Sequence, residues 1–218
     1  MFSYWAEWLP SLLGALVTSV TLTAGALAIG LPLGVLIAIT ATAPQRSIRY
    51  LVIAFVELGR GVPALILLYF MYFGLTQVRI RLSDTVAVMA ALGLNCAAYA
   101  SEIFRGALET IPHGQWEGAR AIGLSRRAIW TYVILPQMQR NAVPPIIGLS
   151  ILVFQTTSLA MTIGASDLMG LAANIGSVTF RYMSVIMLAG LLYAAVSIPA
   201  SQVAGVLQRR RERRPAQR

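Results

Sequence analysis

The sequence contains no lysine, a single histidine, His113, and a single cysteine, Cys96. The absence of lysine excludes a P-loop, a Schiff-base lysine and a lysine general base. One cysteine allows no disulfide within the chain, and one histidine allows no multi-histidine metal site. No Gly-x-Ser-x-Gly motif occurs, so a serine nucleophile would depend on His113 as its base. We therefore expect no catalytic residue, no metal site and no cofactor on this chain.

Charge is scarce as well. Asp, Glu, Lys and Arg together make up 11% of the 218 residues, and the mean hydropathy is +0.72. A soluble domain carries about a quarter charged residues. A membrane-spanning helix needs roughly 20 mostly apolar residues. Long intervals without any charge therefore predict membrane spans, and they lie between Glu7 and Arg46, Arg60 and Arg79, Asp84 and Glu102, Arg140 and Asp167, and Arg181 and Arg209.

The predicted fold is all-α: a polytopic membrane protein with five transmembrane helices, at about 13–41, 50–75, 85–104, 143–165 and 182–207. Ahead of the first span, Trp8 to Leu13 predicts an interfacial lead-in, with Trp5 and Trp8 as anchors at the headgroup level. No basic stretch precedes this span, which argues against a cleaved signal peptide. Gly30 to Gly34, with Pro32 at its centre, predicts a kink. A short helix is expected in the periplasmic stretch 166–180.

The arginines predict the orientation. If successive loops are assigned to alternate sides of the membrane, most of the arginines fall on one side, and the opposite side has only Arg79, Arg81 and Arg181. The +9 net charge therefore lies mainly on the first side. The positive-inside rule then places the N-terminus outside and the C-terminus in the cytoplasm. The Arg-rich tail 208–218 follows a span directly, so we expect it to meet anionic lipid headgroups rather than nucleic acid. The residues on the basic side are Arg46, Arg49, Arg105, Arg120, Arg126, Arg127, Arg140 and those of the tail.

Two segments of the chain echo each other. Glu57 and Arg60 in the second span have the same spacing as Glu102 and Arg105 at the end of the third. Residues at i and i+3 share a helix face and can pair. We interpret Glu102–Arg105 as a structural ion pair near the interface. Glu57–Arg60 is expected deeper in the membrane, where ionisable groups are functional candidates, so a structural and a pathway role stay equally open.

The longest cytoplasmic segment, 106–140, is predicted to be structured. Residues 114–122 read as a short helix that Gly123 terminates. Ser125 reads as the N-cap of a second helix, 126–135, which Pro136 ends or kinks. Small side chains on the first helix leave a face open to a partner, and a few apolar ones offer contact surface. The alternative is a hairpin that lies on the lipid. The small residues are Gly118, Ala119 and Ala121, and the apolar ones are Trp116, Ile122 and Leu124.

This segment resembles the permeases of ABC importers. Their signature, E-A-A-x3-G-x9-I-x-L-P, is matched by Glu117-Gly118-Ala119, Gly123 and Val133-Ile134-Leu135-Pro136, with Gly118 and Val133 as mild departures. The resemblance extends to the polar amino-acid permease branch, the binding-protein-dependent type I importers. It is carried there by Arg60-Gly61-Val62-Pro63, the run from Ala98 to Gly106, the run from Ile111 to Glu117, and Leu135-Pro136-Gln137.

The resemblance implies a mechanism and a set of partners. The first loop helix would insert into a groove on an ATP-binding subunit, so that ATP and magnesium are bound by the partner and not by this chain. Two such ATPase subunits, a second permease copy or a related permease, and an extracytoplasmic substrate-binding protein would complete a complex in the bacterial inner membrane. The residues implied in ATPase coupling are Gln115, Trp116, Glu117, Gly118, Ala119, Arg120, Gly123, Leu124 and Ser125.

A polar cluster in the fourth span is the candidate substrate site. Gln155, Thr156, Thr157 and Ser158 interrupt an otherwise apolar helix. From the residues alone, a substrate cavity and simple interhelical or backbone hydrogen bonding are equally compatible with this cluster. Many similar permeases read K-D-T-S-L at this place, and this resemblance makes the substrate cavity the preferred interpretation. The Lys and Asp of that pattern are replaced here by Gln155 and Thr156, which favours glutamate, aspartate or glutamine as the substrate. Arg60, Asn95 and Tyr99 are the further pathway candidates. A permease for a basic amino acid is the alternative.

Two other classes of protein explain the sequence less completely than an ABC importer permease. A secondary transporter or channel without an ATPase would explain the spans but gives the structured loop no role. A membrane-embedded enzyme lacks a catalytic constellation. The sequence does not decide between a homodimer and a heterodimer of permeases.

Overall fold

The computed structural model describes residues 4–43 and 45–212, so the last six residues of the predicted tail, 213–218, lie outside the described part. Every regular element within that part is helical, which confirms the all-α prediction. In chain order these are α1 (Trp5–Thr40), α2 (Arg46–Gly61), α3 (Ala64–Tyr69), the π-helix η1 (Phe70–Gly74), α4 (Leu75–Gln77), α5 (Asp84–Glu109), α6 (His113–Ala121), α7 (Arg126–Ala128), the π-helix η2 (Ile129–Ile134), α8 (Leu135–Thr156), the 3-10 helix η3 (Thr157–Ile163), α9 (Leu168–Thr179) and α10 (Tyr182–Glu212).

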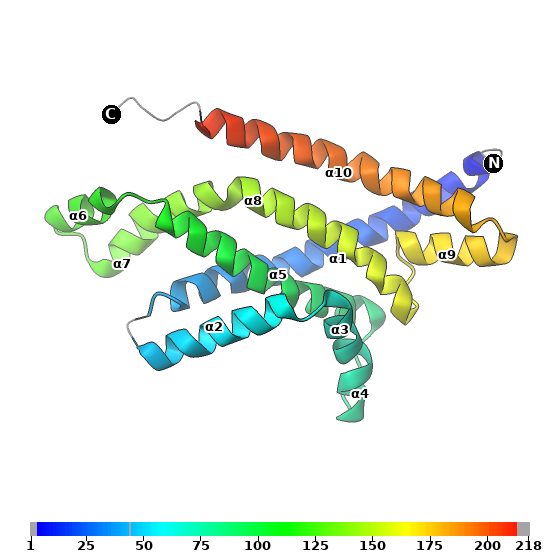
Figure 1. The fold of residues 1–218 in the computed structure, drawn as a ribbon, viewed down its shortest axis with the longest axis horizontal. Helices are drawn as coiled ribbons and strands as arrows, with labels where there is room; N and C mark the ends of the chain where they lie inside the picture. Colours follow the sequence, from blue (N-terminus) through cyan, green and yellow to red (C-terminus); the bar gives the residue numbers. More distant parts are fainter. Residues whose placement is uncertain (1–3, 44, 213–218) are drawn as a thin grey trace.

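The long helices run roughly side by side along the molecule (Figure 1). Four helical segments are long and apolar enough to cross a membrane: Trp5–Thr40, Asp84–Glu109, Arg126–Ile163 and Tyr182–Arg209. A fifth candidate is a bent pair of helices, Arg46–Gly61 with Ala64–Gln77. At one end of the molecule lie α6 and the last described turns of α10; the N-terminus and α9 lie at the other (Figure 1).

The second predicted span, 50–75, is not one helix. Its two halves meet at an angle of 100°, with the break at Val62 and Pro63. Pro63 has no N–H to donate to the carbonyl of Gly59 four residues earlier, so the helical ladder stops there. The Asn95 side chain of α5 donates to that carbonyl instead, with an Nδ2–O distance of 2.9 Å. The sequence prediction missed this break, although Gly61-Val62-Pro63 carried its signal.

The first helix begins earlier than predicted. It is continuous from Trp5, and Trp8 is only 6% exposed because it packs with Leu12 against Leu168 and Val185. The Trp5 indole N–H donates to Ser184 Oγ at 3.1 Å. The prediction of a separate lead-in with Trp8 as a headgroup anchor is therefore wrong: these turns pack on α9 and α10.

Small residues let α1 and α5 approach closely. A Cβ added to Gly30 would lie 2.7 Å from the Cβ of Cys96, and one added to Gly34 would lie 2.7 Å from the Cβ of Ala100. Helices in membranes associate through such small-residue contacts. The helix runs on through Pro32 as one assigned element, so the predicted kink does not divide it. The contact with α5 is what these glycines provide.

Candidate functional site

The loop between α5 and α8 forms the predicted helix and turn. The helix α6 ends at Ala121, and Gly123 has φ +79°, a left-handed conformation that glycine adopts without strain. The N–H of Leu124 donates to the Ala119 carbonyl at 3.2 Å and closes the helix end. Ser125 Oγ accepts from the N–H of Ala128 at 3.3 Å, so its predicted capping role is confirmed.

One face of α6 is anchored to the body of the protein. The Trp116 ring meets the Trp130 ring of η2 edge-on, with 5.3 Å between ring centroids. Ala119 is 6% exposed, and Gln137 Nε2 donates to Gln115 Oε1 at 3.2 Å. Trp116 and Leu124 are half-buried. Trp116, expected as contact surface for a partner, therefore serves mainly to hold α6 on η2.

The opposite face of α6 is open. Glu117, Gly118 and Arg120 are exposed, and Ile122 is 76% exposed. A Cβ added to Gly118 would have no atom within 4 Å. The outward surface therefore has open space at Gly118 and presents the charges of Glu117 and Arg120 with the apolar side chain of Ile122.

The second loop helix does not end at Pro136. It continues through η2 into α8, so that Arg126–Ile163 is one unbroken helical segment. The N–H of Leu135 donates to the Trp130 carbonyl five residues earlier, the pattern of a π-turn. Proline is tolerated at the start of a helical stretch, where its missing N–H is not needed, and Pro136 stands where the π-helix gives way to α8. Of the two predicted effects of Pro136, the end of the helix is therefore wrong, and the proline instead stands at a local change of helix type. The helix α6 rests on the end of the fourth membrane helix.

A groove lies beside α6. It has a volume of about 480 Å³ and is lined by aromatic, apolar and basic side chains. Arg120 and Arg126 both border it, and neither forms an ion pair with another described residue. The remaining lining residues are Thr42, Trp116, Leu124, Ile129 and Trp130.

The two predicted ion pairs form one network. Arg60 Nη1 lies 3.9 Å from Glu57 and 3.6 Å from Glu102, so it bridges α2 and α5. Arg105 contacts Glu102 at 2.7 Å and also Glu109 at 2.6 Å. Glu57 is not sequestered, since its side chain is 70% exposed in the described chain. The sequence prediction missed Glu109, whose spacing of four residues from Arg105 was the available signal.

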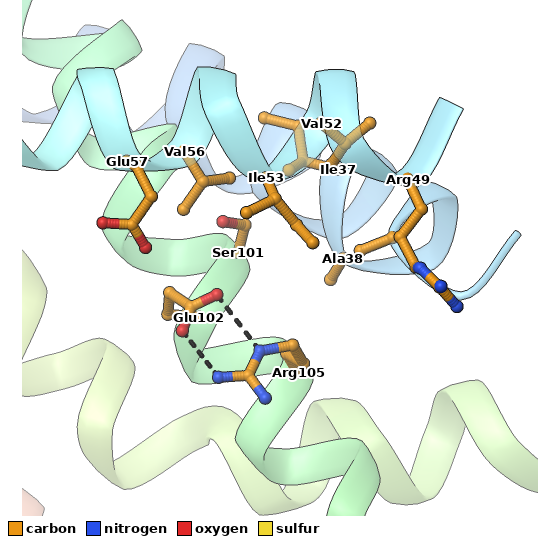
Figure 2. Close-up of a pocket in the computed structure, with 11 residues that line it drawn as sticks. Ile37, Ala38, Arg49, Val52, Ile53, Val56, Glu57, Ser101, Glu102 and Arg105 are labelled. Atoms are coloured by element: carbon orange, nitrogen blue, oxygen red, sulfur yellow. Dashed lines mark hydrogen bonds and ion pairs between the residues drawn. The ribbon is translucent and has the colours of Figure 1, made fainter. Parts of the chain in front are cut away.

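A cavity of about 330 Å³ lies next to this network, between α1, α2 and α5. Figure 2 shows Glu57 and Arg49 from α2, with Glu102 and Arg105 from α5, around its rim, while Ile37, Ile53 and their neighbours supply an apolar wall. Both signs of charge border the same space, so a zwitterion would find partners for each of its charges there.

Asn95 and Tyr99 lie at the break in the second span. The Asn95 side chain donates a hydrogen bond to the Gly59 carbonyl, and the Tyr99 hydroxyl donates one to the Arg60 carbonyl at 3.4 Å. The Arg60 guanidinium lies 5.8 Å from the Tyr99 ring centroid, so two of the predicted pathway residues meet, and Asn95 contacts the backbone of the residue before Arg60. The side chains of Asn95 and Tyr99 both donate to backbone carbonyls, a structural role that the sequence analysis did not predict for them.

The polar cluster lies where α8 becomes η3. Three hydroxyls donate to carbonyls of their own helix: Thr156 to Leu152 at 2.7 Å, Thr157 to Phe154 at 2.8 Å and Ser158 to Gln155 at 2.8 Å. Thr157 is fully buried, whereas Gln155 is exposed. Gln155 is the member whose side chain is directed to open space.

Asp167 is a polar residue that the sequence analysis did not select. It is fully buried and accepts the N–H groups of Met169 and Gly170 at the start of α9. Burial raises the pKa of its carboxyl, and these hydrogen bonds only partly offset that effect. Its signal was an isolated acid just after a long uncharged run.

The sequence and the structure were compared with known proteins. Residues 30–214 match the family model described as "Binding-protein-dependent transport system inner membrane component". The chain is 32% identical over 181 residues to the probable amino-acid ABC transporter permease protein YckA of Bacillus subtilis, covering 83% of this chain and 80% of that one. It is 30% identical over 225 residues to the arginine ABC transporter permease protein ArtQ of Escherichia coli K12, covering 91% and 94%.

Solved structures agree with these relatives. A chain of a crystal structure of an amino acid ABC transporter with histidines superposes with a TM-score of 0.88 at 28% identity, covering 96% of this chain and 98% of that one. A chain of the MetNI methionine ABC transporter in an inward-facing conformation gives a TM-score of 0.72 at 21% identity, with 95% and 99% covered, and supports the fold. The helical membrane architecture, the loop signature and these matches together show that the chain belongs to the binding-protein-dependent family of inner-membrane transport components, as a permease of the amino-acid ABC importer type.

Proposed function

We propose that α6 is the element through which a separate ATPase drives this permease. The observation that carries the proposal is the unbroken helix from Arg126 to Ile163. At one end it holds α6 through the Trp116–Trp130 contact, and at the other it carries Gln155 and Ser158. A displacement of α6 by the ATPase would therefore be passed along one rigid element to the candidate substrate residues. Binding energy at the loop would bias the bundle between two states.

The open face of α6 is the proposed contact surface. Gly118 admits the partner closely, Ile122 supplies an apolar contact, and Glu117 supplies a charge. The groove beside it presents Arg120 and Arg126 without an ion-pair partner among the described residues, so an acidic side chain of the ATPase is the complementary group. Charge complementarity of this kind steers and orients association.

The assembly we propose has two permease subunits, two ATPase subunits and an extracytoplasmic binding protein. The permeases would be two copies of this chain or this chain with a related one. Because α6 and the end of α10 lie at the end opposite the N-terminus, an ATPase at α6 implies a cytoplasmic C-terminus and an external N-terminus (Figure 1). The arginine distribution supports the same orientation.

For the substrate we propose glutamate, aspartate or glutamine. Position 156 is Thr rather than an acid, and Gln155 presents an uncharged amide to open space. Arg49, Arg60 and Arg105 lie near the cavity between α1, α2 and α5, where they would favour a substrate carboxylate. A basic amino acid is the second candidate, favoured by the similarity to the arginine permease ArtQ and by Glu57 and Glu102 beside the same cavity.

The coupling proposal is tested with Glu117→Lys in a complex copurified with its ATPase. We expect ATP turnover and copurification to fall at least about tenfold, since a charge at the centre of a docked interface is reversed. Glu7→Lys is the matched control, because Glu7 is also exposed but lies in the first turn of α1, and the N-terminus and α6 are at opposite ends of the molecule (Figure 1). Undiminished assembly and turnover in Glu117→Lys would show that α6 is not the docking element.

A further inference from the structure

The buried carboxylate of Asp167 joins four elements of the fold. It follows η3, begins α9, and meets Ser19 of α1 and Tyr193 of α10. None of these residues belongs to the coupling surface or to the ion-pair network. The carboxylate is fully buried within the described chain, so its charge depends on the hydrogen bonds that the surrounding residues give it.

All of the hydrogen bonds to Asp167 come from neutral donors. Its Oδ1 accepts the Gly170 N–H at 2.9 Å. Its Oδ2 accepts the Met169 N–H at 3.3 Å, the Tyr193 hydroxyl at 3.3 Å and the Ser19 hydroxyl at 3.5 Å. Ser19 Oγ in turn accepts the Leu168 N–H at 3.1 Å. Among the described side chains, those of residues 4–43 and 45–209, no cation forms an ion pair with this carboxylate.

The network also reaches the candidate substrate cluster. The Tyr193 ring packs on Phe154, with 5.1 Å between ring centroids, and the Phe154 carbonyl accepts the Thr157 hydroxyl at 2.8 Å. Thr157 is the buried member of the polar cluster. Asp167 is thus connected through one tyrosine to the turn at which α8 becomes η3.

Such a carboxylate resists any separation of the helices around it. If α1 or α10 moved away, Asp167 would lose its hydroxyl donors in apolar surroundings, and no cation is at hand to replace them. The α9 N–H groups and the positive end of that helix would remain, but they belong to the same segment as Asp167. A fully buried carboxylate without an ion-pair partner among the described side chains is costly to keep charged. A residue that costs stability in this way points to a role other than stabilising the fold.

We propose that Asp167 is a positioning residue that keeps the surrounding parts of α1, η3, α9 and α10 together as one rigid unit and so holds Thr157 in place during transport. The proposal rests on the proposed transport function. Other elements then move when the permease changes between its two transport states. One of them is the break at Val62 and Pro63, where two helices meet without continuous backbone hydrogen bonds.

The first test separates positioning from stability. Asp167→Asn keeps the shape of the side chain and an acceptor for the α9 N–H groups but removes the charge. We expect the thermal midpoint and the basal ATP turnover of the complex to be maintained, while amino acid transported per ATP falls at least about fivefold. Tyr193→Phe should give part of the same loss, and the two changes together should be less than additive.

The matched control is Ser150→Ala, which removes a hydroxyl that donates only to its own helix, to the Ile146 carbonyl at 2.8 Å. Transport per ATP should stay unchanged in this variant. A purely structural Asp167 would give the reverse pattern in Asp167→Asn, namely a lower thermal midpoint with an unchanged ratio of transport to hydrolysis. That result would overturn the proposal.

The second test measures the rigid unit directly. Cys96→Ala gives a cysteine-free chain, and Trp5→Cys with Ser184→Cys then places thiols on α1 and α10 where the native side chains touch at 3.1 Å. Joining them with a short thiol crosslinker should leave ATP-driven uptake within about twofold of the uncrosslinked complex. Loss of uptake that reversal of the crosslink restores would show that α1 and α10 move apart, and the proposal would fail.

Crosslink yield gives a readout that does not require transport. It should fall in Asp167→Asn relative to the same cysteine pair with Asp167 intact, and an equal yield would contradict the proposed tie. If the uncrosslinked complex shows no ATP-driven uptake at all, it is the proposed function that fails, and crosslink yield still decides the role of Asp167.

Discussion

The two ends of the fourth membrane helix use polar residues in opposite ways. At the end near α6, the polar side chains of Glu117 and Arg120 are exposed, as is the backbone at Gly118. The other face of α6 is held by the contact of Trp116 with Trp130. At the other end, the hydroxyls of the cluster turn back onto their own helix. The first arrangement leaves binding capacity free for a partner, whereas the second has already used most of it. A row of polar residues therefore marks a binding site only where the backbone does not satisfy it first.

The largest expected effect comes from filling the open face of α6. Gly118→Trp should weaken binding of the ATPase at least about 100-fold, because a large side chain would stand where the partner packs. The isolated permease should keep its stability, since nothing lies within 4 Å of a Cβ at this position. Affinity is measured by titrating the ATPase onto the permease in nanodiscs. Gly190→Trp, at another open glycine, is the control, and equal weakening in both would contradict a docking face at α6.

The next effect tests the other end of the same helix. Gln155→Ala should raise the KM for the transported amino acid about tenfold, because Gln155 is the exposed member of the cluster. Thr156→Val should change KM less than about twofold, since its hydroxyl already donates to Leu152. Uptake into proteoliposomes at varied substrate concentration measures both. A larger effect from Thr156→Val than from Gln155→Ala would reverse the comparison between outward and inward polar groups.

A smaller effect is expected at the break in the second span. Asn95→Leu removes the donor to the Gly59 carbonyl and should lower the free energy of unfolding by about 1 kcal/mol. Tyr99→Phe should cost less, because its hydrogen bond of 3.4 Å is long. Thermal unfolding in detergent compares the two variants. An unchanged stability in Asn95→Leu would show that the carbonyl finds another donor.

The smallest effect concerns pH. The pKa of Asp167 is raised above its ordinary value of 3.8 by burial. Between that value and the raised one the folded chain binds more protons than the unfolded chain, so the free energy of unfolding falls as the pH rises through this interval. The stability of the wild type minus that of Asp167→Asn, measured from about pH 4 to about pH 7, should decline, because groups common to both proteins cancel in this difference. A wild type that gains stability over Asp167→Asn as the pH rises would contradict the sign.

Local signals in the sequence were sufficient to predict α6 and the turn that follows it. Gly123 acts through its own backbone conformation and Ser125 through a side-chain hydrogen bond to a residue three positions on, so the turn could be predicted without knowledge of the rest of the fold. Pro136 and Pro63 show the limit of that approach. The first is accommodated by a π-turn and does not end its helix, whereas the second breaks its helix, and Asn95 from a distant part of the chain supplies the missing donor.

Long-range contacts account for what the sequence prediction missed. Trp8 was expected at the membrane interface because tryptophan favours it, but α9 and α10 cover this side chain. Asp167 gains its significance only when Ser19 and Tyr193, far away in the chain, come within hydrogen-bonding distance. Arg60 was predicted with Glu57 alone, and the fold gives it Glu102 as a second partner.

The most direct test of coupling through α6 is uptake of labelled amino acids into proteoliposomes that contain the permease, its ATPase and the binding protein. We expect accumulation that requires ATP on the α6 side, with glutamate, aspartate or glutamine as substrate, and its loss in Glu117→Lys but not in Glu7→Lys. Accumulation driven by an ion gradient without ATP would contradict the coupling. Strong ATP-driven uptake of arginine or histidine alone would leave the coupling intact and overturn the proposed substrate.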